Sequence, residues 1–155
     1  MSSINPVFLL PQALQEHGED LASNFVDSVT LGVGQFCTAP GLLFAIKGPE
    51  LDTFLQYAEK YLAKKAPGVM LHAGIRQNYQ LGIEKLTALK EVERVGEVRK
   101  SEAGCLAAPV LLKTTAATLL EKSEIAEEVF GPSSVIVVCT SRKELLAAAQ
   151  NLQGQ

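Results

Sequence analysis

The sequence predicts an α/β domain in which helices cover both faces of a largely parallel sheet. Short apolar runs at residues 6–10, 42–46, 109–112 and 135–138 are the predicted strands. None of them alternates apolar with polar residues, which is typical of strands that are covered on both sides. Amphipathic helical patterns separate these runs, and such a succession of strands and helices indicates an α/β fold.

Two long helices are expected in the first half of the chain. Residues 12–29 repeat apolar side chains on one face of a helix. The second helix is predicted over residues 49–65, because Pro49 suits a first turn, lysines occupy the last turn, and the Ala-Pro-Gly sequence at 66–68 ends the pattern.

The second half predicts a helix around residues 75–86, a short helix between the last two strands, and a final helix from Ser141 onward. Ser141 and Glu144 have the spacing of a capping box, which contributes about 1 kcal/mol to helix stability. The stretch 90–105 fits either a short strand or a loop. We find no internal repeat and no linker that would indicate a second domain.

Composition restricts the class of partner. The 155 residues carry a net charge of −3, from 14 Lys and Arg against 17 Asp and Glu. A protein that neutralises many phosphates needs a basic surface, so we expect no nucleic-acid partner. No apolar stretch approaches the ~20 residues that span a bilayer, and the first residues lack a signal peptide. We therefore expect no membrane partner and a cytoplasmic location.

Cysteine and histidine spacing argues against a metal site. Cys37, Cys105 and Cys139 have no CxxC spacing, and His17 and His72 lie far from one another and from any cysteine in the sequence. We therefore expect no metal and no disulfide framework. Cys105 and Cys139 are interpreted as structural residues.

The segment 31–41 places Cys37 among glycines, between a predicted helix and a predicted strand. A cysteine in such a loop can supply a nucleophile, with backbone N–H groups as part of an oxyanion hole. On spacing alone, a small, partly buried loop residue is the simpler interpretation of Cys37, because a single cysteine is a weak signal. The glycines at 32 and 34 are not a dinucleotide fingerprint, because they follow a helix and no third glycine comes at the required spacing.

A second segment, residues 126–132, lies just before the last predicted strand. Its Gly131-Pro132 pair is typical of a turn, and that turn is the simpler interpretation of the whole segment. The neighbouring carboxylates Glu127 and Glu128 leave acid–base chemistry open as an alternative.

Taken together, the two segments are more specific. Gly34-Gln35-x-Cys37, followed by Glu128-x-Phe130-Gly131-Pro132, resembles the aldehyde dehydrogenase superfamily and its cysteine-bearing catalytic domain. The amino-acid sequence around Asn5-Pro6 and after Cys37 is similar to that of the α-ketoglutarate semialdehyde (2,5-dioxopentanoate) dehydrogenase branch. The resemblance covers essentially all 155 residues but only part of the family's chain.

The resemblance implies an activity and three site residues. Cys37 matches the nucleophile that attacks an aldehyde and passes through a thiohemiacetal and a thioester, with its own N–H helping to hold the oxyanion. Glu128 matches the glutamate that hydrogen-bonds the nicotinamide ribose, and Phe130 the aromatic residue beside the nicotinamide. The implied cofactor is NAD or NADP, the implied substrate is a small aldehyde, and the implied intact enzyme is a homo-oligomer.

The chain also departs from the family's pattern. The family's general base precedes the segment that begins here at Met1, and its nucleotide-binding domain lies further upstream. Thr30 and Gly32 stand where Phe-x-Asn often precedes the cysteine motif. We therefore expect residues 1–155 to be a catalytic-cysteine domain fragment without a nucleotide-binding domain, and the isolated chain to have little or no dehydrogenase activity.

Two other functions remain open at this level. One is a truncated, catalytically silent α/β module that serves binding or assembly. The other is a cysteine hydrolase or acyltransferase, which requires His17 or His72 to meet Cys37. The sequence favours neither histidine as a partner of Cys37. His17 lies in a helix that leads away from Cys37 and is expected to face solvent, and His72 is expected in a loop.

Overall fold

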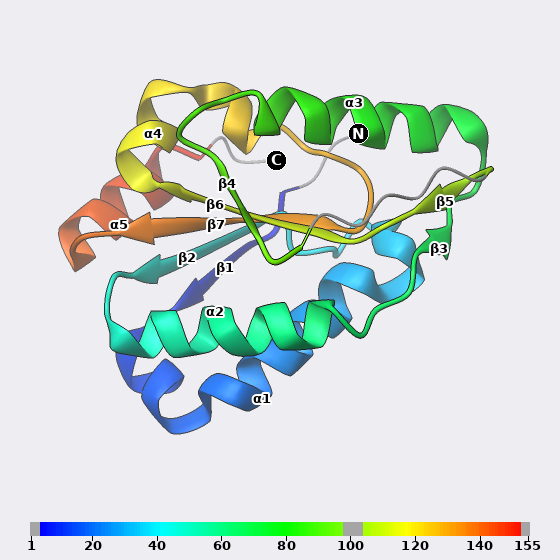
Figure 1. The fold of residues 1–155 in the computed structure, drawn as a ribbon. Helices are drawn as coiled ribbons and strands as arrows, with labels where there is room; N and C mark the ends of the chain where they lie inside the picture. Colours follow the sequence, from blue (N-terminus) through cyan, green and yellow to red (C-terminus); the bar gives the residue numbers. More distant parts are fainter. Residues whose placement is uncertain (1–3, 98–103, 153–155) are drawn as a thin grey trace.

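A five-stranded sheet forms the centre of the molecule (Figure 1). The computed structural model describes residues 4–97 and 104–152. The strand order is β1-β2-β7-β6-β4. These strands are β1 (Pro6–Leu9), β2 (Leu42–Ile46), β7 (Ser133–Cys139), β6 (Val110–Thr115) and β4 (Glu93–Val95).

Four of the five strands run parallel, as predicted. β1 pairs with β2, β2 with β7, and β7 with β6, all in parallel register. β4 pairs antiparallel with β6 at the edge of the sheet. The stretch 90–105, which fits either a short strand or a loop, therefore contains a short strand. A separate two-stranded sheet joins β3 (Gly68–Val69) to β5 (Leu106–Ala107).

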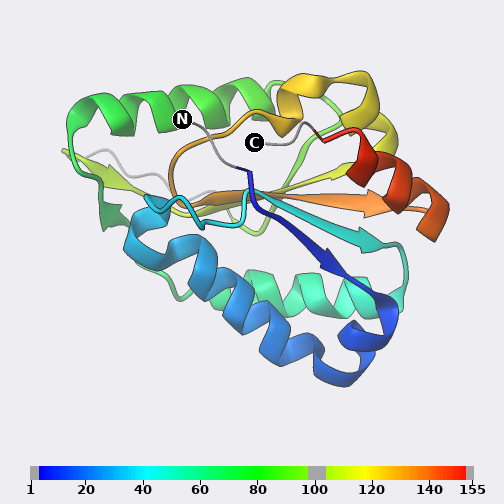
Figure 2. The ribbon, with the colours of Figure 1, turned by 180° about the vertical axis from the view of Figure 1, so that it is seen from behind.

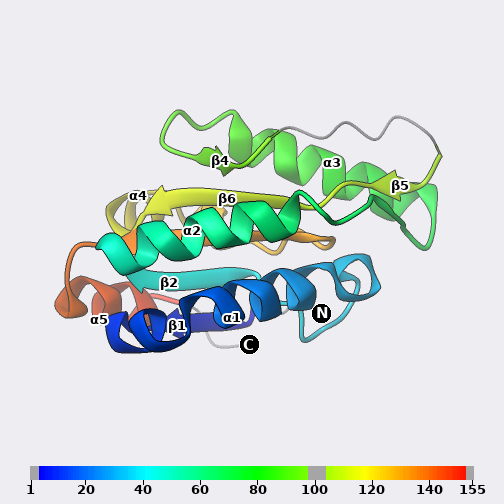
Figure 3. The same ribbon diagram turned by 60° about the horizontal axis from the view of Figure 1, so that its bottom comes forward.

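Helices cover both faces of the sheet, as Figures 1 and 3 show. On one face lie α1 (Pro11–Thr30) and α2 (Pro49–Leu62); on the other lie α3 (Ala73–Thr87), α4 (Ala116–Glu121) and α5 (Arg142–Gln150). Two short 3₁₀ helices, η1 (Leu31–Gly34) and η2 (Ser123–Ala126), follow α1 and α4. The predicted α/β class, with a largely parallel sheet between helix layers, is confirmed.

The core is divided by the sheet. Leu43, Leu111 and Ile136 are fully buried on the face that α1 and α2 cover. The alternate residues Phe44 and Leu112 are fully buried on the other face, against α4, α5 and the end of α3. Burial on both faces explains why the strand sequences are continuous apolar runs rather than alternating ones.

Several boundaries differ from the predicted ones. α2 ends at Leu62 rather than at residue 65. α1 contains a kink, because His17 has non-helical backbone angles. β6 continues to Thr115; within it Lys113 pairs with Glu93 of edge strand β4, and the two side chains form an ion pair at 2.9 Å. The part of the ambiguous stretch around Val98 lies outside the described residues.

In the part of the chain that the structure describes, no helix is long and apolar enough to cross a membrane.

Candidate functional site

Parallel pairing brings three segments to one edge of the sheet. Pro6 of β1 lies opposite Leu42 of β2, and Leu42 lies opposite Val135 of β7. The residues that precede these strands therefore meet at the amino ends of the strands. Open α/β sheets more commonly bind ligands at the carboxyl ends of their strands. Here both segments that the sequence singles out enter their strands from the amino end (Figure 2).

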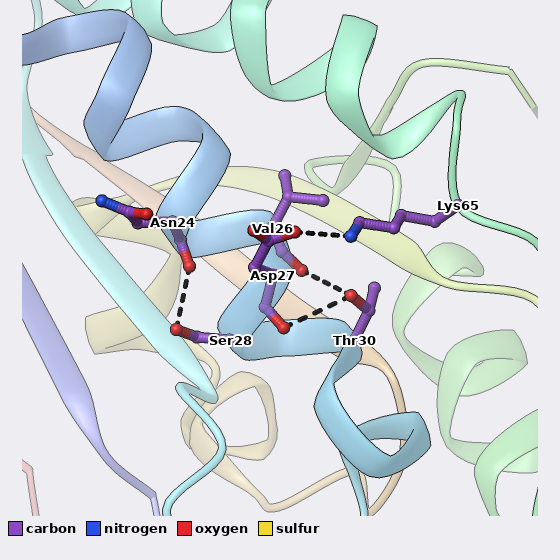
Figure 4. A network of polar contacts seen from close by, with 6 residues as sticks. All are labelled: Asn24, Val26, Asp27, Ser28, Thr30 and Lys65. Carbon is purple, nitrogen blue, oxygen red and sulfur yellow. Dashed lines mark hydrogen bonds and ion pairs between the residues drawn. The ribbon is translucent and has the colours of Figure 1, made fainter.

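The end of α1 delivers the cysteine loop. In its last turns, Ser28 Oγ donates to the Asn24 carbonyl and Thr30 Oγ1 to the Val26 carbonyl, each at 2.8 Å (Figure 4). Lys65, just beyond α2, forms an ion pair with Asp27 of α1. The two hydroxyl bonds lie within α1, and the Lys65–Asp27 ion pair connects the end of this helix to the segment that follows α2.

After α1 the backbone turns through left-handed geometry. Gly32, Val33 and Gly34 have φ values of 55°, 60° and 65°. A β-branched residue in this region carries strain of order 1–3 kcal/mol, and such strain gathers at functional sites. Val33 is accommodated by a glycine, because a Cβ atom on Gly68 would lie 2.5 Å from Val33 Cγ2.

The cysteine loop is held by side chains on both sides of it. Asn5 Nδ2 donates to the carbonyl oxygens of Cys37 and Ala39, at 2.7 and 3.1 Å. Gln35 Oε1 accepts from the Leu71 N–H at 2.9 Å, which connects the loop to the segment after β3. Cys37 is exposed. The loop therefore presents this thiol to solvent on a backbone that is fixed by hydrogen bonds.

Helix α3 holds the second segment. The buried Tyr79 hydroxyl donates to the carbonyls of Ala108 and Pro132, at 2.8 and 3.3 Å. Burial raises the pKa of this hydroxyl, so it stays protonated as a donor. One turn further on, Val129 packs against Gly82, where a Cβ atom would lie 2.9 Å from Val129 Cγ1.

The two adjacent carboxylates of this segment have different surroundings. Glu127 is exposed and pairs with Lys85 Nζ at 2.9 Å, and this hydrogen bond raises the pKa of Lys85. Glu128 is half-buried and, among residues 4–97 and 104–152, no hydrogen bond or ion pair engages its carboxylate. Glu128 is thus the one of the pair that is open to a ligand.

The cysteine loop and the second segment touch each other. A Cβ atom on Gly34 would lie only 2.1 Å from the Gly131 carbonyl oxygen, so the two backbones are in direct contact. A shallow pocket lies beside this contact, and its lining includes Phe36 and Ala39 from one segment and Glu128 and Phe130 from the other. Cys37 is not a lining residue; it is exposed between Phe36 and Ala39.

The sequence of this chain is similar to those of known proteins. No family model matches the chain. It is 46% identical over its whole length to alpha-ketoglutaric semialdehyde dehydrogenase 2 of Azospirillum brasilense. It is 35% identical, again over its whole length, to alpha-ketoglutaric semialdehyde dehydrogenase of Acinetobacter baylyi. The chain is homologous to a segment of the aldehyde dehydrogenases. It spans about 30% of the length of each of these two relatives.

A solved structure agrees with the aldehyde dehydrogenase fold. The chain superposes on 1-pyrroline-5-carboxylate dehydrogenase from Thermus, solved with bound NAD, with a TM-score of 0.80. The match covers 97% of this chain and 30% of that one, at 20% sequence identity. This superposition confirms the predicted fold, and the two sequence relatives confirm the resemblance to the α-ketoglutarate semialdehyde dehydrogenase branch.

The two histidines do not form a catalytic pair with Cys37. His17 is exposed and lies 3.9 Å from Glu16, as expected of a solvent-facing residue. His72 lies in the loop before α3, as predicted, and it caps that helix, with Nδ1 accepting from the N–H groups of Gly74 and Ile75. Using this nitrogen as a cap leaves it occupied, which disfavours a Cys-His pair. Within the described residues, no His, Cys, Asp and Glu cluster could hold a metal.

Sequence reasoning missed Asn5 and Tyr79 as residues that support the site. Asn5 had a usable signal, because it directly precedes a predicted parallel strand and so belongs at the same edge as the cysteine loop. Tyr79 had none, since its spacing on α3 shows only that it faces the core. Its partners, Ala108 and Pro132, are 29 and 53 residues away in sequence.

Proposed function

We propose that this chain is the catalytic-cysteine segment, residues 1–155, of an NAD(P)-dependent aldehyde dehydrogenase that oxidises an aldehyde to its carboxylic acid. The contact between Gly34 and Gly131 carries the proposal, because it joins the loop of Cys37 to the segment of Glu128 and Phe130. The names of the two relatives supply the reaction class.

In the proposed reaction, Cys37 is the nucleophile. Its thiolate adds to the aldehyde carbon, and the carbonyl oxygen becomes an oxyanion that backbone N–H groups of the loop stabilise. Loss of hydride from the same carbon leaves a thioester on Cys37. Water then adds to the thioester, the carboxylic acid leaves, and the thiol is restored. The exposure of Cys37 leaves its sulfur accessible to a small aldehyde.

The residues of the second segment fit one end of a nicotinamide cofactor. The half-buried carboxylate of Glu128 can accept hydrogen bonds from ribose hydroxyls, and the exposed ring of Phe130 offers an aromatic face beside it. Bound NAD or NADP supplies the acceptor for the hydride. These two residues hold only one end of a dinucleotide, so the rest of its site belongs to other parts of the enzyme.

The substrate class follows from the relatives. Both are named for α-ketoglutaric semialdehyde, and we extend this keto-acid semialdehyde to the present chain as its aldehyde substrate. A general base and a nucleotide-binding domain would come from the 70% of such enzymes that the match leaves uncovered. The isolated chain is therefore expected to turn over little or no aldehyde, and homo-oligomerisation and a cytoplasmic location stay predictions for the whole enzyme.

A chimera tests the proposal. This chain would replace the matching 155-residue segment of the Azospirillum brasilense relative, and reduced nicotinamide would be followed with α-ketoglutaric semialdehyde and either cofactor. We expect turnover that Cys37→Ser abolishes and Cys105→Ser, the matched control, leaves in place. A chimera that folds, as judged by circular dichroism and size, but has no turnover would contradict the proposal and favour a catalytically silent module.

A further inference from the structure

The amide group of Asn5 is matched to two carbonyl oxygens of the cysteine loop. Its NH₂ has two hydrogens, and Nδ2 donates to Cys37 O at 2.7 Å and to Ala39 O at 3.1 Å. Asn5 is 32 residues from Cys37 in sequence and reaches it because β1 and β2 pair in parallel. One side chain therefore connects the start of β1 to the loop on both sides of Thr38.

These bonds fix the peptide planes around the proposed nucleophile. The peptide that follows Cys37 is held by Asn5 through the Cys37 carbonyl. The peptide that precedes it is held through the Phe36 carbonyl, which accepts from the Ala39 N–H at 3.1 Å. In a trans peptide the N–H points opposite to the C=O. The directions of the Cys37 and Thr38 N–H groups are therefore both set.

We propose that Asn5 is a positioning residue that holds the cysteine loop in the conformation in which its backbone N–H groups face the oxyanion formed on Cys37. This inference rests on the proposed function, because it presumes attack by Cys37 on a carbonyl. Asn5 itself does not touch the reacting atoms. Through the Cys37 carbonyl it sets the direction of the Thr38 N–H, and through the Ala39 carbonyl, whose peptide with Pro40 has no N–H, it anchors the far side of the loop. Pre-set donors need no reorganisation during the reaction.

Two reactions of the same thiol separate this role from a general loss of structure. Acylation by p-nitrophenyl acetate passes through an oxyanion, whereas alkylation by iodoacetamide displaces iodide without forming one. Both rates would be measured at Cys37 in the full chain by peptide mass spectrometry, with Cys105 as the internal reference. We expect Asn5→Ala and the isosteric Asn5→Asp to lower the ratio of acylation to alkylation at Cys37 by about tenfold or more.

The matched control is Thr114→Val. It removes another side-chain bond to a distant backbone carbonyl, from Thr114 Oγ1 to Glu91 O at 2.9 Å, and we expect it to leave the ratio at Cys37 unchanged. An Asn5 variant that changes both rates equally, or neither, overturns the inference. If wild-type Cys37 is acylated no faster than Cys105, the proposed function itself fails. The two failures are therefore distinguishable, and a variant of lowered stability still reports through the ratio.

Discussion

Gly34 and Gly131 lie in backbone contact, and this contact connects the cysteine loop to the segment that carries Glu128. A Cβ atom on Gly34 would lie 2.1 Å from Gly131 O and 2.5 Å from the nitrogen of Pro132. Both neighbours are backbone atoms, so they cannot rotate away as a flexible side chain would. Gly34 also has a φ of 65°, which favours glycine. The meeting of the two segments thus depends on the absence of a side chain.

We predict that Gly34→Ala lowers the free energy of unfolding by about 2–4 kcal/mol, from overpacking and backbone strain together. Gly18→Ala is the matched control, because a Cβ atom there meets nothing within 4 Å and the residue lies within α1. Alanine at Gly18 should raise stability by about 0.5–1 kcal/mol. Urea unfolding of both variants measures this, and two effects of the same sign and size would contradict the contact.

Tyr79→Phe tests how α3 holds the second segment. The variant leaves the carbonyls of Ala108 and Pro132 without the hydroxyl donor, which should cost about 1–3 kcal/mol in unfolding free energy. Denaturant titration at neutral pH gives the value. Tyr57→Phe, on α2, serves as the control that removes a hydroxyl elsewhere. A Tyr79→Phe cost no greater than that of the control would mean that the hydroxyl does not hold the turn.

The contribution of Tyr79 to the free energy of unfolding should depend on pH in the alkaline range. Burial raises the folded-state pKa of Tyr79 above the unfolded value of about 10, so its contribution is complete below about pH 10. As pH rises further, the unfolded state ionises first and that stability is progressively lost. The stability difference between wild type and Tyr79→Phe should therefore stay constant up to about pH 10 and shrink as the pH rises above it. A constant difference would contradict the burial of an ionisable hydroxyl here.

The carboxylate of Glu144 should make the free energy of unfolding depend on pH in the opposite direction, in the acid range. Hydrogen bonds from the Thr140 hydroxyl and N–H lower its carboxyl pKa. Its own N–H donates to Ser141 Oγ, which is the Ser141 half of the predicted capping box, while its carboxylate accepts from Thr140, the residue before the N-cap. A lowered folded-state pKa gives stability that is present above the unfolded pKa, about 4.3, and is lost as pH falls through the folded pKa. Glu144→Gln should thus be less stable than wild type at pH 7, with the gap closing below about pH 4. A gap that widens on acidification would refute the sign.

The three thiols should react in the order of their accessibility. Cys37 is exposed, Cys105 is half-buried, and Cys139 is fully buried, where desolvation raises its pKa to about 11. In native protein at pH 8, iodoacetamide should label Cys37 first and Cys139 only after unfolding. Timed peptide mapping gives the order. Labelling of Cys139 ahead of Cys37 would show that the fold opens at β7.

The sequence is most informative where one local pattern decides the structure. The strands at the centre of the sheet are predictable because Phe44 and Leu112 stand within continuous apolar runs, and burial on both faces requires such runs. The polar end of β6 is not predictable, since Lys113 stays in the strand through its pairing with Glu93 of β4. Pairing between distant segments has no local signal.

The site divides in the same way. Cys37, Glu128 and Phe130 could be proposed from two short motifs, whose meeting follows from the parallel pairing of β2 with β7. The left-handed Val33 was not predictable, because a valine adopts that geometry only where the surrounding fold enforces it, here beside Gly68. The hydrogen bonds from Asn5 to the cysteine loop likewise depend on the parallel register of β1 and β2.

The proposed role of Cys37 is to carry the acyl group during aldehyde oxidation. The most direct measurement is an acid quench of the chimera during turnover of α-ketoglutaric semialdehyde, followed by mass spectrometry of its cysteine peptides. We expect an acyl adduct on the peptide of Cys37, formed only when aldehyde and oxidised cofactor are both present. Reduced nicotinamide formed with the adduct on another residue, or turnover that persists in Cys37→Ser, would contradict it.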